Sequence, residues 1–123
     1  MIFLTSDGQL FLKSHDGMNL ISLNSILYLK AEGAYTKLIL KEGDNLIICK
    51  HLIVFQKLLN PHGFLRIHRS FLVNISKISF FQSKHRVVKI QENEIPVSKR
   101  NGDKIFNILL SKGIKDGNNK CRS

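Results

Sequence analysis

The chain has 123 residues, 43% of them hydrophobic, and a formal net charge of +10 at neutral pH. This length fits one domain with a core of its own, and no apolar run approaches the roughly 20 residues that a membrane-spanning helix needs. Met1–Leu4 is followed at once by Thr-Ser-Asp-Gly, so we expect no secretory signal peptide.

The two cysteines indicate a reducing compartment. Cys49 ends the apolar run Leu46–Cys49 and is expected to pack as a small hydrophobic residue, whereas Cys121 lies in a polar tail. We expect no disulfide between them, and therefore a cytoplasmic protein.

An antiparallel meander is predicted for the first part of the chain. Short runs of partly alternating apolar and polar residues predict strands at Gln9–Lys13, Met18–Leu23, Ser25–Ala31, Tyr35–Lys41 and Leu46–Cys49. Turn-forming residues separate them, and an Asp-Gly pair between apolar runs, as at Asp16-Gly17, is a strong hairpin signal.

The second part of the chain mixes helices and strands. Apolar residues at helical spacing predict a helix of about two turns over His51–Leu59, which Pro61 and Gly63 end. Lys77–Gln82 and Arg86–Gln91 are expected to form a hairpin. Glu94–Val97 is expected to be an edge strand because it contains a proline. Ser98 then resembles an N-cap of a final helix running to about Leu110.

Positive charge is concentrated in the second half. Residues 1–63 hold six Lys and Arg against five Asp and Glu, whereas residues 64–104 hold nine against three and residues 105–123 hold four against one. Such a gradient favours a polyanion-binding half, although a basic surface that is merely solvated has the same composition.

The stretch Phe64–Asn74 is the centre of this basic half. Its apolar residues, among them Phe64, Ile67 and Val73, would anchor it in a core, but two arginines, a histidine, a serine and an asparagine lie between them. An unpaired buried polar group costs about 1–3 kcal/mol, and an unpaired charge costs more. These polar side chains therefore face an anionic partner or, in an ordinary amphipathic turn, only solvent.

The start of the predicted last helix breaks a local rule. Acidic residues are favoured there because the helix dipole is positive at its N-terminus, yet the sequence reads Ser98-Lys99-Arg100. Free backbone N–H groups and two cationic side chains could converge on a phosphate. Two solvated side chains in a tolerant first turn are the alternative.

The sequence contains few features of an enzyme or of a metal-binding protein. The five histidines are scattered without a ligand spacing, and the common nucleotide-binding, hydrolase and Cys-x-x-Cys motifs are missing. His68 lies two residues from Ser70, but no acidic residue nearby in the sequence could orient such a pair. We expect no enzyme and no cofactor.

Three segments, taken in order, resemble the signature of LytTR (LytR/AlgR-type) DNA-binding domains of bacterial transcription regulators. The central one is Phe64–Asn74. Upstream, Ile26–Thr36 is similar to the family pattern I-x-Y-I-x-A-x-x-x-Y-T, and downstream Ile95–Arg100 is similar to I-P-V-S-R. We assign residues 1–110 to this domain, and residues 111–123 to a polar, basic tail that we expect to be disordered.

The resemblance implies a mainly β fold: an elongated stack of small antiparallel sheets, with a short helix before the central motif and a C-terminal helix. It also implies sequence-specific binding of double-stranded DNA through loops that enter successive major grooves and bend the duplex. The base-reading positions carried over by motif are Tyr35, Thr36, Lys37, Arg69 and Arg100. The neighbours expected to hold phosphates or shape the turn are His68, Ser70, Asn74, Lys77 and Lys99.

Two features depart from the family pattern. The last motif reads Ser-Lys-Arg where Ser-Arg is usual, and Arg100 is the better candidate for a base contact because its planar fork can bond O6 and N7 of a guanine together. Family members usually carry a receiver domain ahead of this one, so the chain is either a stand-alone regulator or an excised effector domain.

The expected partner is double-stranded DNA with repeated half-sites about one helical turn apart, bound by two copies of a protein that is monomeric in solution. A sensor, receiver-bearing or other regulatory protein is a further expected partner, and a membrane is not. A single-stranded RNA-binding module and a protein-interaction domain with a basic face are the alternatives. The operator sequence, the genes controlled and the direction of control are not encoded in these patterns.

Overall fold

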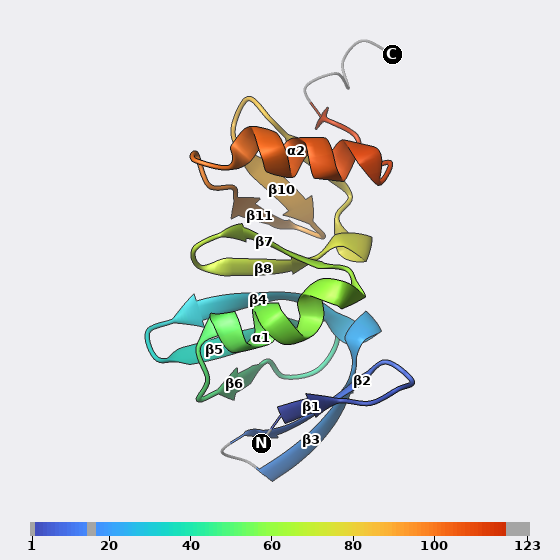
Figure 1. Ribbon diagram of the computed structural model, residues 1–123, viewed down its shortest axis with the longest axis vertical. Helices are drawn as coiled ribbons and strands as arrows, with labels where there is room; N and C mark the ends of the chain where they lie inside the picture. The colour runs from blue at the N-terminus through green and yellow to red at the C-terminus, as the bar shows by residue number, and fades with distance from the viewer. Residues whose placement is uncertain (1, 15–16, 118–123) are drawn as a thin grey trace.

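The computed structural model describes residues 2–14 and 17–117, which form an elongated stack of three small antiparallel sheets and two helices (Figure 1). The N-terminal sheet contains β1 (Ile2–Leu4), β2 (Gln9–Ser14) and β3 (Gly17–Ser22). The central sheet contains β4 (Ile26–Glu32), β5 (Tyr35–Leu40), β6 (Leu46–Ile48), β7 (Phe64–His68) and β8 (Phe71–Asn74). The third sheet contains β9 (Phe80–Gln82), β10 (Val87–Ile90) and β11 (Asn93–Pro96).

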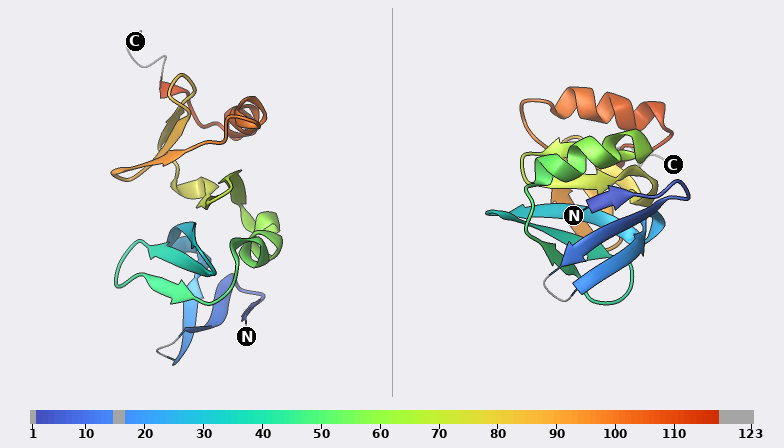
Figure 2. Two further views of the ribbon diagram at one scale, coloured as in Figure 1. Left: turned by 90° about the vertical axis from the view of Figure 1, so that its left-hand side faces the viewer. Right: turned by 60° about the horizontal axis from the view of Figure 1, so that its bottom comes forward.

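The helices are α1 (Leu52–Leu59), which lies beside the central sheet, and α2 (Gly102–Ser111), which covers the third sheet at the top of the stack (Figures 1 and 2). Short 3₁₀ turns are formed by η1 (Leu23–Ser25), η2 (Asn60–His62) and η3 (Ile75–Lys77). The mainly β fold class is therefore confirmed, as is the placement of its two helices. No helix among these residues has the length and apolarity to cross a bilayer.

The single meander predicted for the first part of the chain is divided between two sheets, because β3 and β4 do not pair. β1 and β8 are strands that the sequence did not indicate. β2 and β3 pair from Gln9↔Ser22 to Ser14↔Gly17, as the predicted hairpin requires. β1 adds to the other edge of β2, where Phe3 and Phe11 stack with ring centroids 4.9 Å apart. The third sheet has the order β11-β10-β9, so Pro96 does lie in an edge strand.

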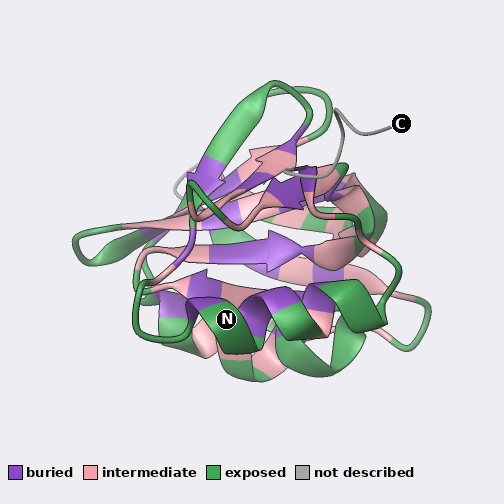
Figure 3. Cartoon of the chain, turned by 90° about the horizontal axis from the view of Figure 1, so that it is seen from above, coloured by how far each residue is buried: buried purple, intermediate pink, exposed green. Residues whose placement is uncertain are grey.

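The central sheet has the order β6-β5-β4-β8-β7, in which β4 and β8 pair although more than forty residues separate them. Side chains alternate across these strands. Leu29 and Leu72 are thereby directed into a lower core with α1 and the N-terminal sheet, while Leu27 and Val73 are directed into an upper core with α2 and the third sheet. The central sheet is thus the layer between two cores, and in the view from above the strands carry most of the buried residues (Figure 3).

Helix α1 begins and ends close to its predicted bounds. Leu52, Phe55 and Leu59 are its buried face, at the helical spacing noted in the sequence. η2 carries Pro61 just after the helix, and Gly63 follows with φ of 88°, a left-handed conformation that a glycine adopts without strain.

Helix α2 begins later than predicted, and Ser98 is not its N-cap. Asn101 precedes the first helical residue, Gly102, and Asp103 supplies the acidic residue expected in a first turn. The backbone N–H of Ser98 instead donates to the carbonyl of Ile67 at 2.8 Å. Ser98 therefore lies ahead of the helix, in a segment that a tertiary hydrogen bond joins to β7.

Two further expectations were wrong. Cys49 is exposed rather than packed, because it follows the last residue of the short edge strand β6. The segment after α2 does not fray at Lys112: Ile114 packs on the upper core, and Asp116 forms a parallel bridge with Phe81 and accepts a hydrogen bond from the backbone of Ser83. Residues 118–123, with Cys121, lie outside the described residues.

Asn74 is a buried structural residue at the end of β8. Its amide nitrogen donates to the carbonyls of Leu23, at 3.3 Å, and Ile26, at 2.8 Å, while its oxygen accepts from the backbone of Ser76 in η3. One side chain therefore joins the start of β4 to the end of β8.

We predict that Asn74→Ala lowers the free energy of unfolding by about 1–3 kcal/mol, because buried carbonyls then lose their donor. Urea denaturation measures this difference. The matched control is Asn107→Ala, an exposed position on α2 that should stay within about 0.5 kcal/mol of the unchanged protein. Equal stability of the two variants would contradict the structural role of Asn74.

Candidate nucleic-acid interface

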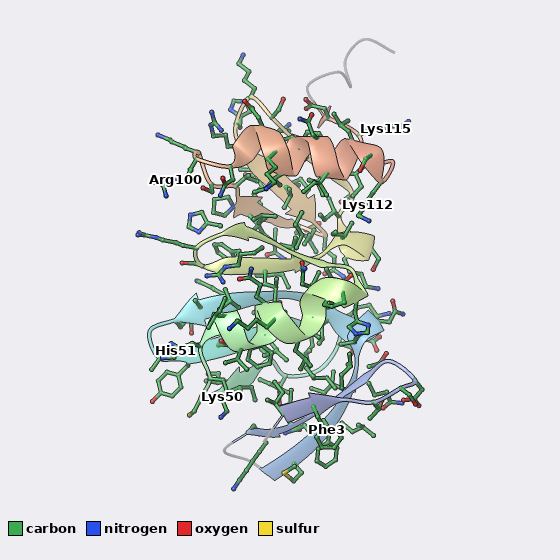
Figure 4. All side chains as sticks on the ribbon, viewed as in Figure 1. Phe3, Lys50, His51, Arg100, Lys112 and Lys115 are labelled. Carbon is green, nitrogen blue, oxygen red and sulfur yellow. The ribbon has the colours of Figure 1, made fainter. Side chains whose placement is uncertain are left out.

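Three connections that are distant in the sequence lie along one side of the stack. The β4–β5 loop, the β7–β8 turn and the segment before α2 all project to the left in Figure 1, and this side faces the viewer in the left-hand panel of Figure 2. Arg100 projects from the same side, with Lys50 and His51 below it (Figure 4). The fold therefore aligns the three motifs along the long axis of the molecule.

The β4–β5 loop carries one exposed and one buried candidate. Tyr35 is 48% exposed at the start of β5. Thr36 is fully buried, and its hydroxyl donates to the carbonyl of Lys50 at 2.7 Å. Lys37 is half-buried in the strand. Thr36 is therefore placed to hold the loop against the β6–α1 connection rather than to touch a ligand.

The β7–β8 turn displays Arg69. Its position is exposed, while those of His68 and Ser70 on either side are half-buried. The backbone N–H of Ser70 donates to Nδ1 of His68 at 3.0 Å, and the carbonyl of Ser70 accepts from the N–H of Ala31 in β4 at 2.8 Å. The turn is thus closed on itself and attached to the neighbouring strand.

An open cleft of about 570 Å³ separates this turn from the segment before α2. Nine residues line it: His68, Arg69, His85, Arg86, Pro96, Val97, Ser98, Lys99 and Arg100. Its titratable groups are all basic. The ion pairs within residues 2–14 and 17–117 join Lys30 to Glu32 and Lys89 to Glu94, so no carboxylate neutralises the cleft. Such a surface attracts a polyanion.

Arg86 and His85 are site residues that the sequence interpretation missed. Arg86 has a positive φ of 54°, and the N–H of Val97 donates to its carbonyl at 2.8 Å. A Cβ on residue 102 would collide with Nη1 of Arg86, so glycine at that position leaves room for the guanidinium. In the sequence His85 and Arg86 lie at the connection of the second predicted hairpin, without a motif of their own, and only the fold brings them to the cleft.

Burial and two cations act on His68 together. Desolvation lowers the pKa of His68 below its ordinary 6.5, and the positive charges of Arg69 and Arg66 lower it further. The neutral imidazole that results can accept the Ser70 N–H at Nδ1, which a protonated ring cannot do. Among the described residues no three His, Cys, Asp or Glu side chains gather as a metal site.

Comparison with known proteins gives the same family as the motifs. The model of the LytTr DNA-binding domain family matches residues 16–110, most of the chain. The chain belongs to the LytTR family. DNA is therefore its binding partner, and its family is a DNA-binding one rather than a catalytic one.

A solved LytTR structure has the same fold. It is the LytTr DNA-binding domain of a protein described as a methyl-accepting/DNA response regulator, from Bacillus cereus. The two sequences are 27% identical, the match covers 84% of this chain and 96% of the other, and the TM-score is 0.69.

Not every position carried over from the LytTR signature lies on the basic side. Arg69, Lys99 and Arg100 meet at the cleft, with His68 and Ser98 beside them. Asn74 is buried, as described above. Lys77 lies in η3, at the opposite end of β8 from the turn, where Nζ donates to Asn24 at 3.1 Å. Neither residue joins the other candidates.

We predict that the pKa of His68, followed by NMR titration, lies below 6.5 and rises in Arg69→Ala, which removes a neighbouring positive charge. Because the folded pKa is lowered, the stabilisation linked to neutral His68 is complete above pH 6.5 and is lost as the pH falls through the folded value. Lys57→Ala removes an exposed cation on α1 that is not among the causes of the lowered pKa, and it should leave the titration unchanged. A His68 pKa at or above 6.5 would contradict this assignment.

Proposed function

We propose that this domain binds specific duplex DNA sequences as the effector of a bacterial transcription regulator, with its long axis along the duplex. In this proposal the loops on the basic side enter successive major grooves and the DNA bends to meet them. The observation that carries the proposal is the alignment of the β4–β5 loop, the β7–β8 turn and the segment before α2 along one side of the stack.

Exposure and charge assign different roles to the candidates. Arg69 and Arg100 are exposed on two segments that face each other across the cleft, and arginine can form two hydrogen bonds to a guanine edge. Tyr35 and Lys37 are the proposed contacts of the third loop. Lys99, His68 and Ser70, together with Arg86, are proposed to contact phosphates, which position a protein on DNA without specifying the sequence.

Further proposals concern assembly. We expect a monomer in solution, and two copies on half-sites about one helical turn apart, which places both on one face of the duplex. The Bacillus cereus domain belongs to a protein described as a response regulator, and this similarity supports the proposal that a receiver-bearing or sensor protein controls DNA binding by this chain. Such a protein would act in the cytoplasm.

The proposal is tested first by selection from random duplex DNA with the purified chain at about 150 mM salt. We expect an enriched motif of paired half-sites, and a bend when that motif is placed at different positions along a fragment. Recovery of DNA with no motif, or tighter binding to a single strand than to any duplex, would overturn the proposal.

We predict that Arg69→Ala and Arg100→Ala each weaken binding to the selected site by roughly 1–3 kcal/mol, with a much smaller loss on random duplex. Lys99→Ala should weaken both alike and reduce the slope of log affinity against log salt by about 0.9. Lys77→Ala removes the same charge on the opposite edge and is the control. Equal losses on both duplexes for all of these variants would contradict the assigned roles.

A further inference from the structure

Arg66 lies within the central motif and is not among the nine residues that line the basic cleft, but it lines a neighbouring pocket that shares His68, Arg69 and Arg100 with that cleft. It is half-buried in β7, and its guanidinium points along the turn rather than out of it. Nε donates to the carbonyl of His68 at 2.8 Å, Nη2 donates to the carbonyl of Arg69, and Nη1 donates to Oε1 of Gln56 at 2.7 Å. Each guanidinium nitrogen therefore has an acceptor on a defined element.

We infer that Arg66 is a positioning residue that fixes the β7–β8 turn and thereby the direction of Arg69, and that Gln56 attaches this arrangement to α1. The inference rests on the proposed base-reading role of Arg69.

The pairing of His68 with Phe71 closes the turn, and further hydrogen bonds fix its residues. His68 Nδ1 holds the N–H of Ser70, and Ala31 holds the carbonyl of Ser70. The carbonyls of His68 and Arg69 are the remaining acceptors, and both are bound by Arg66. Because an arginine fork has a fixed planar geometry, two such bonds constrain orientation as well as distance.

The register of β7 explains why Arg66 reaches the turn. The pairing of β7 with β8 shifts between Arg66 and His68, a β-bulge that places Ile67 as an extra residue. Bulges redirect side chains near functional sites. Ile67 is buried in the upper core and its carbonyl accepts the N–H of Ser98, so the same irregularity also joins the turn to the segment of Lys99 and Arg100.

The electrostatics of Arg66 suit a positioning role. Its partners are neutral carbonyl and amide oxygens, and no ion pair joins it to a carboxylate among the described residues. A carboxylate would hold the guanidinium equally well but would cancel a positive charge beside the cleft. Burial lowers the pKa of Arg66, and arginine remains charged despite this.

A direct contact of Arg66 with DNA is the competing explanation. The three acceptors use three of the five guanidinium N–H groups, so such a contact would be made by the two that remain or by breaking one of these bonds. The two explanations differ in their coupling to Arg69: a positioning residue acts only while Arg69 is present, whereas an independent contact adds to it.

The test measures affinity for the selected site and for random duplex at one salt concentration. Arg66→Lys keeps the charge but not the fork, so we expect about a five- to tenfold loss on the selected site and less than about twofold on random duplex. Gln56→Ala should give a smaller loss of the same kind. Lys57→Ala, the next residue on α1 and exposed, is the matched control and should change neither affinity.

In an Arg69→Ala background, Arg66→Lys should have almost no further effect on the selected site. Additive losses, or equal losses on both duplexes, would overturn the inference. If Arg66→Lys does not fold, as judged by its thermal unfolding, Gln56→Ala carries the same comparison.

A separate readout distinguishes failure of this inference from failure of the proposed function. The amide resonance of Ser70 in the free protein should shift in Arg66→Lys and Gln56→Ala and stay unchanged in Lys57→Ala. If Arg69→Ala does not reduce discrimination between the two duplexes, the base-reading role of Arg69 is wrong, while the Ser70 shift still supports the positioning. An unchanged Ser70 resonance in both variants would overturn the positioning itself.

Discussion

The pairing of β4 with β8 is the constraint on which the rest of the structure depends. It brings together two strands that are remote in the sequence, and it makes their alternate residues face opposite cores. Leu29 and Leu72 lie opposite each other and belong to the lower core, whereas Tyr28 and Val73 form the next pair and contact the upper one. A slip of one residue in this register would exchange the two faces, so the hydrophobic pattern fixes the register strongly.

This register also sets the positions of the functional segments. The β4–β5 loop and the β7–β8 turn leave the central sheet on the same side, and the hydrogen bond from Ala31 to Ser70 joins them at the edge. The bond from Ser98 to Ile67 then brings the segment before α2 alongside. Loops on a rigid scaffold can present contacts with defined spacing, which a duplex with regular grooves requires.

On the basic side of the stack, the exposed cations and the buried polar groups belong to different residues. The exposed cations Arg69, Lys99 and Arg100 form no ion pair with a carboxylate among the described residues, so their field is available to a polyanion. Thr36 and Arg66 use their polar groups within the protein, on the carbonyls of Lys50 and of the turn. Buried and half-buried residues of this kind hold the backbone from which the exposed residues project.

Local patterns in the sequence were enough to predict the family, the mainly β class and most of the elements. The spacing of Leu52, Phe55 and Leu59 predicted α1, and Asp16-Gly17 predicted the first hairpin, since periodicity and turn chemistry act over a few residues. The Arg69 turn and the Lys99–Arg100 segment were likewise visible as basic residues set between apolar ones.

The positions of these residues in space depend on contacts between distant segments, which local patterns do not encode. Ser98 had the chemistry of a cap, but it lies in a segment joined to Ile67, and α2 begins only at Gly102. Asn74 and Thr36 had the chemistry of contacts, but burial makes them structural. Arg86 lines the cleft, and the guanidinium of Arg66 binds carbonyls of the β7–β8 turn. Neither position could be predicted from a local pattern. Hydrogen bonds between distant segments outweigh local propensity wherever the fold buries the groups concerned, because a buried polar group without a partner costs more than a poor cap.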